Sequence, residues 1–518
     1  MEFNRSKLMW ACFLTLIAAG MGFAVRGGLL LDWGEKFGFT QVDLGTITGG
    51  GLTGFGVVIL LASLVTDRLG YKAILFTAFI LHVVSVVVTV CATPAYDAGG
   101  KDAAYWFLFA GVFIFAVANG LCETAINPLI ANIYPEKKTH YLNILHAGWP
   151  GGLILGGLLG YVLVGKEGIP WEVPLGLYLL PTLWYGFIVA REKFPASDVQ
   201  KAGISTGEML MEFASPVLLF LLLLHACVGY VELGTDSWIV NITESMTQQG
   251  FLLFIYTSAL MFVLRFFAGP IVEKINPLGL LCGSTVLGAL GLLFLSSVQS
   301  VALAWVAVTV YGLGKTFLWP TMLGIVGERF PRGGAITMGA IGGAGALSAG
   351  LIAGPAIGYK QDYNAAEQLQ TQNVETYERY AAADAAGLWF FPAAPQVRGL
   401  DGQKVGVILD GGGPAATLKK DIAKLEQQNE AVPAVLSDLN QWWDSTASEH
   451  QGGDKGPVEE ARIHGGRMAL KWTAAVPAGM FVGYLILVIY FRMKGGYTQI
   501  ELTEGEKKPE DDEQMPDE

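Results

Sequence analysis

The chain has 518 residues, of which 52% are hydrophobic and 15% are charged, and its formal net charge is −12 at pH 7. Soluble proteins carry roughly 25% charged residues, so this composition excludes an ordinary soluble protein of this size. The negative charge lies in two segments, since residues 360–466 and residues 501–518 each carry seven more acids than bases. The rest of the chain is nearly neutral, and the net charge therefore gives no information about a ligand.

Apolar runs long enough to cross a bilayer recur along the whole chain. About 20 apolar residues in a helix span the hydrocarbon core, and continuous apolarity predicts helices where alternation would predict barrel strands. The sequence thus predicts an all-α membrane protein with twelve transmembrane helices. The expected spans are residues 8–31, 44–65, 73–93, 105–133, 141–164, 171–190, 215–239, 250–272, 278–297, 301–327, 334–358 and 469–492.

The distribution of Lys and Arg between the loops predicts the orientation. Loops after even-numbered spans are basic, as at residues 67–72 and 136–138, whereas residues 240–250 and 297–301 contain no Lys or Arg. Basic loops stay in the cytoplasm, so we expect both termini there, in a multi-pass protein of the plasma (inner) membrane. The five cysteines fall in or beside spans without metal-ligand spacing, and we expect no metal and no cofactor.

The chain repeats itself at an interval of six spans. Residues 120–128 in span 4 match residues 312–320 in span 10, and residues 62–68 match residues 268–274. A third match relates span 1 to span 7. The repeat predicts two pseudo-symmetric six-helix bundles with a site between them, as described for secondary transporters.

One long segment interrupts the second copy between spans 11 and 12. Its Ala-rich stretches Ala365–Ala386 and Ala415–Trp443 favour helices, and Val405–Leu409 is a short strand candidate. Two interpretations stay open: a cap over the outer mouth, or a solvated variable loop without a role in transport. The expected domains are an N-terminal bundle (1–190), a cytoplasmic linker (191–214), five helices of the C-terminal bundle (215–359), an extracytoplasmic insert (360–466), the twelfth helix (467–492) and an acidic cytoplasmic tail (493–518).

Four ionisable residues lie inside predicted spans: Arg26, Glu123, Glu232 and Lys315. Charges are costly in a bilayer and mark functional sites by default. Spans 1 and 7 correspond in the repeat, as do spans 4 and 10, so we expect Arg26 to pair with Glu123 and Glu232 with Lys315. Such pairs either only stabilise the helices or line the cavity and exchange a proton. Glu123 is the preferred proton carrier and Glu232 the second, while Asp236 is expected in water at the cavity mouth.

Polar and aromatic residues lie near these charges in the sequence. Amides bind hydroxyl groups, and indole faces cover the C–H surface of a sugar, although Trp near a span end is also a common interfacial anchor. The candidate substrate-binding residues are Asn127, Asn143, His146, Trp149, Trp238 and Trp319.

A short basic loop follows span 2. Asp67, Arg68, Gly70 and Lys72 resemble the cytoplasmic signature of the major facilitator superfamily, with Ser63 at the usual first glycine. An acid there can engage neighbouring helix ends, so we predict a gating role for this loop. The degenerate copy in the second half contributes Glu273 and Lys274 to the same prediction.

Residues 123–128 and 135–143, together with Pro320 and Thr321, resemble the fucose–proton symporter branch of that superfamily. The resemblance implies the major facilitator fold, proton-coupled uptake of sugars, and a coupling role for Glu123. Gly27 stands where the branch has an acid in span 1, and His146 and Trp149 replace smaller amides. The long insert is a further departure from the branch.

We therefore expect a secondary active transporter that carries a monosaccharide or related small polar solute with protons by alternating access, with sodium as the alternative coupling ion. The first alternative is a carrier of a sugar acid or other organic anion, or an exporter. The second is a transporter-like receptor. No nucleophile–base set appears in the sequence, so an enzyme is not expected. The expected partners are a small solute and the bilayer, with no nucleic acid, and we expect a monomer.

Overall fold

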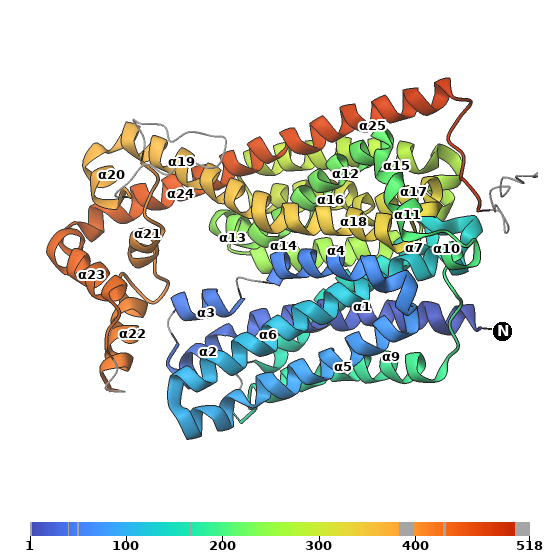
Figure 1. Cartoon of the computed structure of the whole chain (residues 1–518). Coiled ribbons are helices and arrows are strands. Elements are labelled where there is room, and N and C mark those ends of the chain that lie inside the picture. Colours follow the sequence, from blue (N-terminus) through green and yellow to red (C-terminus); the bar gives the residue numbers. More distant parts are fainter. Residues whose placement is uncertain are drawn as a thin grey trace, which may run out of the picture.

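The computed structural model describes residues 3–39, 41–48, 51–164, 168–382, 398–427 and 431–502. Helices make up most of the described chain, and the β pairing within it is an isolated bridge between Ala381 and Leu400. Long helices run side by side between two ends (Figure 1). One end carries the small helices of the insert and is called the insert face. The other carries the N-terminus and the linker at residues 191–215 and is called the linker face. The predicted all-α fold is confirmed.

In its described residues the first half contains nine α-helices, and some predicted spans are divided between two of them. The helix at residues 92–133 joins two segments across a kink at Gly100, whose φ of 71° is a conformation that favours glycine. The α-helices of the first half are α1 (Arg5–Gly28), α2 (Leu30–Phe37), α3 (Gln41–Thr48), α4 (Gly51–Leu69), α5 (Tyr71–Val90), α6 (Ala92–Ile133), α7 (Lys138–Leu163), α8 (Glu172–Leu177) and α9 (Leu179–Arg191).

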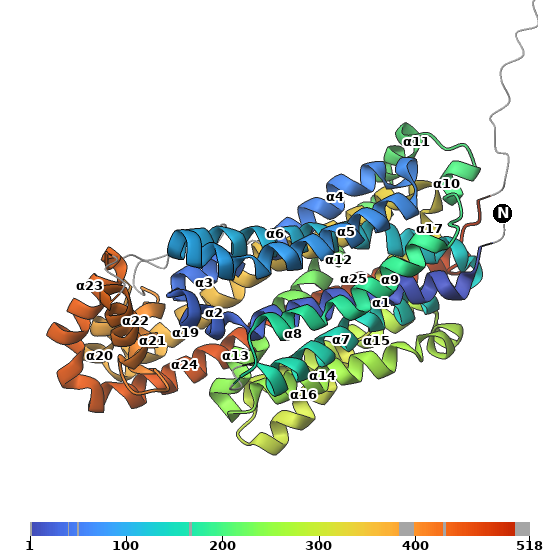
Figure 2. The same ribbon diagram turned by 90° about the horizontal axis from the view of Figure 1, so that it is seen from below.

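Two short linker helices, α10 (Asp198–Lys201) and α11 (Thr206–Met211), lie at the linker face beside the N-terminus, as Figure 2 shows from below. The second half follows with its spans again broken into shorter helices. Its elements are α12 (Pro216–Gly229), the π-helix η3 (Tyr230–Gly234), α13 (Thr235–Thr247), α14 (Gly250–Arg265), α15 (Ala268–Ser297), α16 (Val301–Lys315), α17 (Leu318–Arg329), α18 (Gly334–Leu347), the π-helix η5 (Ser348–Ala353), α19 (Gly354–Gln372) and, after the insert, α24 (Gln451–Thr473) and α25 (Ala475–Met493).

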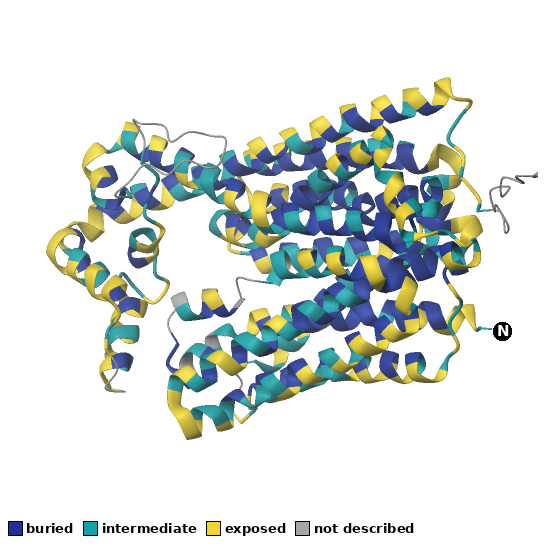
Figure 3. Ribbon diagram, viewed as in Figure 1, coloured by how far each residue is buried: buried dark blue, intermediate teal, exposed yellow. Residues whose placement is uncertain are grey.

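Apolar side chains cover the outside of this helical body. Within the described residues, ten helical stretches are long and apolar enough to cross a membrane, and Gly250–Arg265 is a shorter apolar helix. Each of the twelve predicted spans contains helix. On α25, the large side chains Val482 and Ile486 are more than half exposed, and Figure 3 shows that exposed positions lie on the outer sides of the helices. A surface of this kind suits lipid.

Glycines bring α1 and α7 into close contact. Gly148, Gly152 and Gly156 recur at every fourth residue of α7, which places them on one helix face. A Cβ atom added at Gly148 would lie 2.6 Å from the Phe13 carbonyl oxygen, and one added at Gly156 would lie 2.6 Å from that of Met21. The absence of side chains there lets the two backbones touch, as small residues do between membrane helices.

We expect Gly152→Ala to destabilise the protein by about 1–3 kcal/mol, the usual effect of overpacking. The new methyl group would overlap the Ile17 carbonyl oxygen and lie 2.8 Å from the Met21 amide nitrogen. Gly160→Ala on the same helix is the matched control, because nothing lies within 4 Å of a Cβ there. Thermal unfolding in detergent should separate the two variants, and equal melting temperatures would contradict the close packing.

The insert has its own hydrophobic core. Buried side chains from four small helices and from α19 and α24 form one cluster that includes Tyr377, Ile408, Leu425 and Trp443. Its helices are α20 (Val374–Tyr380), α21 (Gly402–Ile408), α22 (Ala416–Gln427) and α23 (Ala434–Trp442). The insert is therefore a packed unit, and Lys424 on α22 donates a hydrogen bond to the Gly34 carbonyl oxygen on α2 of the first half.

The strand prediction within the insert was wrong. Val405–Leu409 lies in and at the end of α21, where Asp401 caps the helix by accepting hydrogen bonds from the amides of Gln403 and Lys404. A short apolar run does not distinguish a strand from a buried helix, and the cap decides for the helix. Parts of the predicted helical stretches, residues 383–386 and 428–430, and the tail from residue 503 onward lie outside the described residues.

Removal of the Asp454 carboxylate is expected to loosen the insert by about 1–3 kcal/mol. Asp454 is 2% exposed and accepts hydrogen bonds from Thr376 and from the Arg379 guanidinium, with Nε at 2.8 Å, and these contacts raise the pKa of Arg379. Hydrogen exchange of α20 and α24 should accelerate in Asp454→Ala. Arg398→Ala, which breaks an exposed pair with Glu378, is the control and should change exchange little.

Candidate functional site

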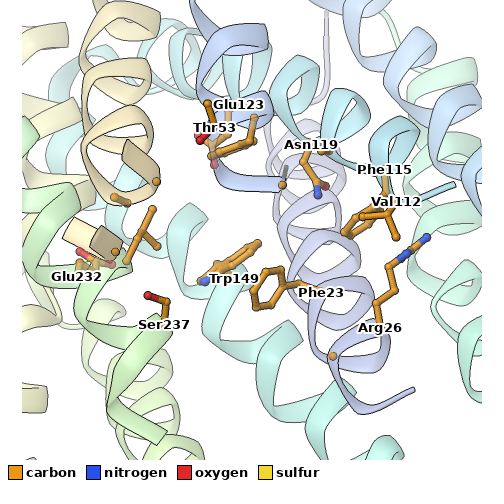
Figure 4. Close-up of a pocket in the computed structure, with 18 of the residues that line it drawn as sticks. Phe23, Arg26, Thr53, Val112, Phe115, Asn119, Glu123, Trp149, Glu232 and Ser237 are labelled. Atoms are coloured by element: carbon orange, nitrogen blue, oxygen red, sulfur yellow. The ribbon is translucent and has the colours of Figure 1, made fainter. Parts of the chain in front are cut away.

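A central cavity of about 480 Å³ lies between the two halves. Figure 4 shows its interior, with Trp149 and Phe23 side by side near the middle and Glu123 and Glu232 on different sides of it. The cavity wall is mainly apolar and aromatic, with a few charged and polar groups. The residues that line it are Phe23, Arg26, Gly27, Leu30, Gly51, Thr53, Phe55, Val112, Phe115, Ala116, Asn119, Glu123, His146, Trp149, Glu232, Leu233, Ser237, Arg265, Trp319, Ala349, Gly350 and Gly354.

Glu123 reaches the cavity from α6 and is 8% exposed. Its carboxylate accepts a hydrogen bond of 2.7 Å from the Asn127 amide one helical turn away. The side-chain oxygen Oδ1 of Asn127 in turn lies 2.9 Å from Nε2 of His146 on α7. Within the described part of the chain, no cation lies within ion-pair distance of Glu123. The predicted pair between Arg26 and Glu123 is therefore wrong.

Arg26 turns instead into the first half. Its guanidinium donates to the Ser85 hydroxyl at 2.6 Å and to the Gly22 carbonyl oxygen at 3.2 Å, and it lies 3.9 Å from the centre of the Phe115 ring. Among the described residues, no carboxylate pairs with Arg26, and its buried Nε has no hydrogen-bond partner. The ring face of Phe115 holds the cation in place of an acid. The neighbouring Gly27 lines the cavity with open space beside it.

The second predicted pair is also wrong. Glu232 on η3 pairs with Arg265 at 2.7 Å and accepts a hydrogen bond of 3.2 Å from the Trp319 backbone amide. Lys315 pairs with Asp236, whose second carboxylate oxygen lies 2.7 Å away. The side chain of Asp236 is 17% exposed and that of Lys315 is fully buried. Asp236 is thus a partner inside the protein and not a solvated group at the mouth.

Sequence reasoning missed Arg265. It lies within the predicted span 250–272, so the same argument that selected the other four charges also applies to it. Arg265 is the last residue of α14, and a basic residue at a helix end has no sequence pattern that separates a buried charge from a loop charge. Among the described residues, six charged groups therefore lie at the cavity or buried beside it: the pairs Glu232–Arg265 and Lys315–Asp236, and Arg26 and Glu123 without ion partners.

Of the six candidate substrate-binding residues, three line the cavity: His146, Trp149 and Trp319. Asn127 stands behind the wall and connects Glu123 with His146. The other two do not line it.

Asn143 donates to Thr321 on α17 at 3.2 Å, which links the two halves. Trp238 packs beside Gly358. Asn119, Ser237 and Phe23 complete the wall, although no motif in the sequence singled them out.

The predicted gating residues all lie at the linker face. Asp67 is buried and accepts a hydrogen bond of 2.8 Å from the Ala335 amide at the start of α18, so a carboxylate of the first half caps a helix of the second. Arg68 donates to Thr206 of the linker. Lys72 donates to the Ala190 and Glu192 carbonyl oxygens at the end of α9.

The remaining three gating residues lie in the turn after α4 and at the start of α15. Gly70 has a φ of 83°, which its turn between α4 and α5 requires. Glu273 forms an exposed pair of 2.9 Å with Lys137 of the first half. Lys274 is exposed beside it.

Other contacts join the halves at this same face. Lys138 donates to the Gly327 carbonyl oxygen at 2.8 Å, and Thr139 donates its hydroxyl to Glu328 at 2.6 Å. A Cβ at Gly324 would overlap Thr139, so α17 and α7 touch closely there. The structure is therefore closed at the linker face by bonds between the two halves. Within the described residues, no group of three His, Cys, Asp or Glu side chains is placed to hold a metal ion.

A helical membrane body with a central cavity between two packed halves is the arrangement found in secondary transporters. The family model described as "Major Facilitator Superfamily" matches residues 11–354, and the chain belongs to this family. It is a multi-pass membrane protein.

Two curated relatives align with parts of the chain. A "Gallate transporter" of Pseudomonas putida is 27% identical over 209 residues, which cover 38% of this chain and 44% of that protein. An "L-fucose-proton symporter" of Escherichia coli (strain K12) is 26% identical over 137 residues, which cover 26% of this chain and 30% of that protein. The alignments thus span less than half the length of either relative.

A solved structure supports the fold. The transporter FucP in the outward conformation superimposes with a TM-score of 0.57 at 17% identity, over 68% of this chain and 92% of that one. At this identity the likeness concerns the fold alone. It agrees with the helical halves described above.

Proposed function

We propose that this protein is a proton-coupled secondary transporter that carries a small polar solute of about monosaccharide size through the central cavity by alternating access. The observation that carries the proposal is Glu123, a carboxylate that lines the cavity without a cationic partner among the described residues. A buried carboxylate without a counter-ion costs least when it holds a proton. Glu123 is therefore suited to load a proton from one side and release it to the other.

The cavity suits a small solute with a ring. Its volume of about 480 Å³ falls within the usual range of small-molecule sites. Trp149 and Phe23 present ring faces whose centres are 5.8 Å apart, and Asn119, Ser237 and Thr53 offer polar groups at the wall. The symporter named for L-fucose among the relatives supports a monosaccharide.

A second candidate substrate is an organic anion. The observation that favours it is Arg26, a cation at the cavity wall that no described carboxylate neutralises and whose Nε has no partner. A solute carboxylate that reached this guanidinium would form a charge-assisted hydrogen bond. The relative named as a gallate transporter supports this candidate.

Orientation follows from the basic loops. The linker face holds the residues Arg68, Lys72 and Lys138, and basic loops remain in the cytoplasm. We therefore place the linker face in the cytoplasm of a plasma-membrane protein and the insert outside. In this orientation the linker-face contacts close the inner side, and the insert lies over the outer one.

The experiment is proton entry into proteoliposomes that contain a pH-sensitive dye. We expect one class of solute, presented under an imposed pH gradient, to accelerate proton entry relative to protein-free vesicles. A panel of neutral monosaccharides and of organic acids of equal size assigns the substrate class. If uptake of a panel solute proceeds without proton movement, the proton-coupled mechanism is wrong.

A further inference from the structure

The Arg265 guanidinium connects three elements at the cavity. Its Nη2 pairs with Glu232 on η3 at 2.7 Å, its Nε donates to the Thr316 carbonyl oxygen at 2.8 Å, and its Nη1 donates to the His146 carbonyl oxygen at 2.6 Å. The first two acceptors belong to the second half, as Arg265 does. His146 belongs to α7 of the first half, so this last bond crosses between the halves. Arg265 is 1% exposed.

Both carbonyl acceptors are free because a proline follows four residues later. In an α-helix the amide of residue i+4 occupies the carbonyl of residue i, and proline has no such amide. Pro150 follows His146 in α7, and Pro320 follows Thr316 at the junction of α16 and α17. Two prolines in different halves thus leave two carbonyls that a single planar guanidinium can collect.

His146 also connects Arg265 to the proposed proton carrier. Its side chain bonds to Asn127, and Asn127 bonds to Glu123. His146 thus joins two sets of hydrogen bonds, one from its ring to Asn127 and Glu123 and one from its backbone carbonyl to Arg265 and Glu232, and the Arg265 bond to that carbonyl crosses the interface.

We propose that Arg265 is a positioning residue that fastens α7 to the second half while the linker face is closed, and that its bond to the His146 carbonyl must be released before that face opens. This inference rests on the proposed alternating access. It extends that function because it names the contact that holds one state. Arg265 acts through the position of α7.

The test measures the separation of the halves by spin-label distances at two faces, with labels on unnatural amino acids so that the native cysteines stay in place. Lys193 and Met493, both exposed, report on the linker face, and Ala98 and Gln299, also exposed, report on the insert face. The baseline is Glu232→Gln, which keeps both carbonyl bonds of Arg265. Addition of Arg265→Gln removes them without leaving an unpaired carboxylate at position 232.

We expect this second substitution to raise the ratio of linker-open to linker-closed molecules by about tenfold, the effect of losing one hydrogen bond to a charged group. Pro150→Ala restores an amide that competes for the His146 carbonyl, and it should shift the ratio in the same direction by less. Pro128→Ala, which removes an interior proline of α6, is the matched control and should not shift it.

Unchanged linker-face distances in the folded double variant, compared with Glu232→Gln alone, would overturn the proposal. Should the double variant fail to fold, Pro150→Ala decides by the same measurement, because it alters no charge: equal distances in Pro150→Ala and Pro128→Ala overturn the proposal. The measurement needs neither solute nor pH gradient. A negative result in the proton-entry assay would therefore contradict proton coupling without contradicting the role of Arg265, and the two proposals can be refuted separately.

Discussion

Glu123→Gln is expected to abolish proton-driven accumulation of solute in proteoliposomes while exchange of solute across the membrane continues. Glutamine has nearly the same shape as glutamate, and its side-chain carbonyl can still accept the hydrogen bond that Asn127 donates to Glu123. It cannot exchange a proton. Exchange of labelled for unlabelled solute requires only the movement of loaded carriers, whereas accumulation requires energy from the proton gradient.

The two assays are best made on the same vesicles. Glu192→Gln is the control, because Glu192 lies at the linker face in a pair with the exposed Lys7 and should leave both activities unchanged. Accumulation that persists at the wild-type level in Glu123→Gln would remove Glu123 from proton coupling. Loss of both activities together with loss of thermal stability would assign Glu123 a structural role instead.

Asp236→Ala is expected to destabilise the protein by about 3–5 kcal/mol, because it leaves the fully buried Lys315 without its partner. The double variant Asp236→Asn with Lys315→Met removes both charges and should recover most of this loss. Glu232→Gln combined with Lys315→Met should show no such recovery of stability. Glu232 pairs with Arg265, so this variant leaves both Arg265 and Asp236 without their partners. Thermal unfolding in detergent, followed by loss of the monodisperse peak, measures all four proteins.

The matched control is a pair at the surface. Lys137 and Glu273 are 2.9 Å apart, but their side chains are 57% and 64% exposed, and an exposed pair contributes only about 0–1 kcal/mol. Glu273→Ala should therefore leave the melting temperature nearly unchanged. A loss in Glu273→Ala as large as that in Asp236→Ala would show that burial does not set the energies of these pairs.

The helical fold was predictable because span length and continuous apolarity act locally, within about 20 residues. The pairing of charges was not, because it depends on which helix faces meet. Glu232 and Asp236 lie one turn apart on neighbouring elements, and the sequence alone does not show which of them faces Lys315. In the structure Lys315 pairs with Asp236, and Glu232 pairs with Arg265.

The site was predictable in part for a related reason. His146, Trp149 and Trp319 were selected by residue type near charged positions, and all three line the cavity. Phe23 and Phe115 were not selected, because an aromatic residue in an apolar span has no pattern that separates a cavity wall from a lipid-facing or core position. The prolines at 150 and 320 were visible in the sequence, but the Arg265 guanidinium that binds the carbonyls they leave free, those of His146 and Thr316, comes from another helix.

The bond between Lys424 and the Gly34 carbonyl oxygen joins the insert, which belongs by chain connection to the second half, to α2 of the first. Any movement that separates α2 from α22 must break this bond. We therefore expect the insert to limit, at a distance from the solute cavity, how far the two halves part on its own face. We expect a binding protein directed against α22 to change transport from the surface, without competing for the cavity.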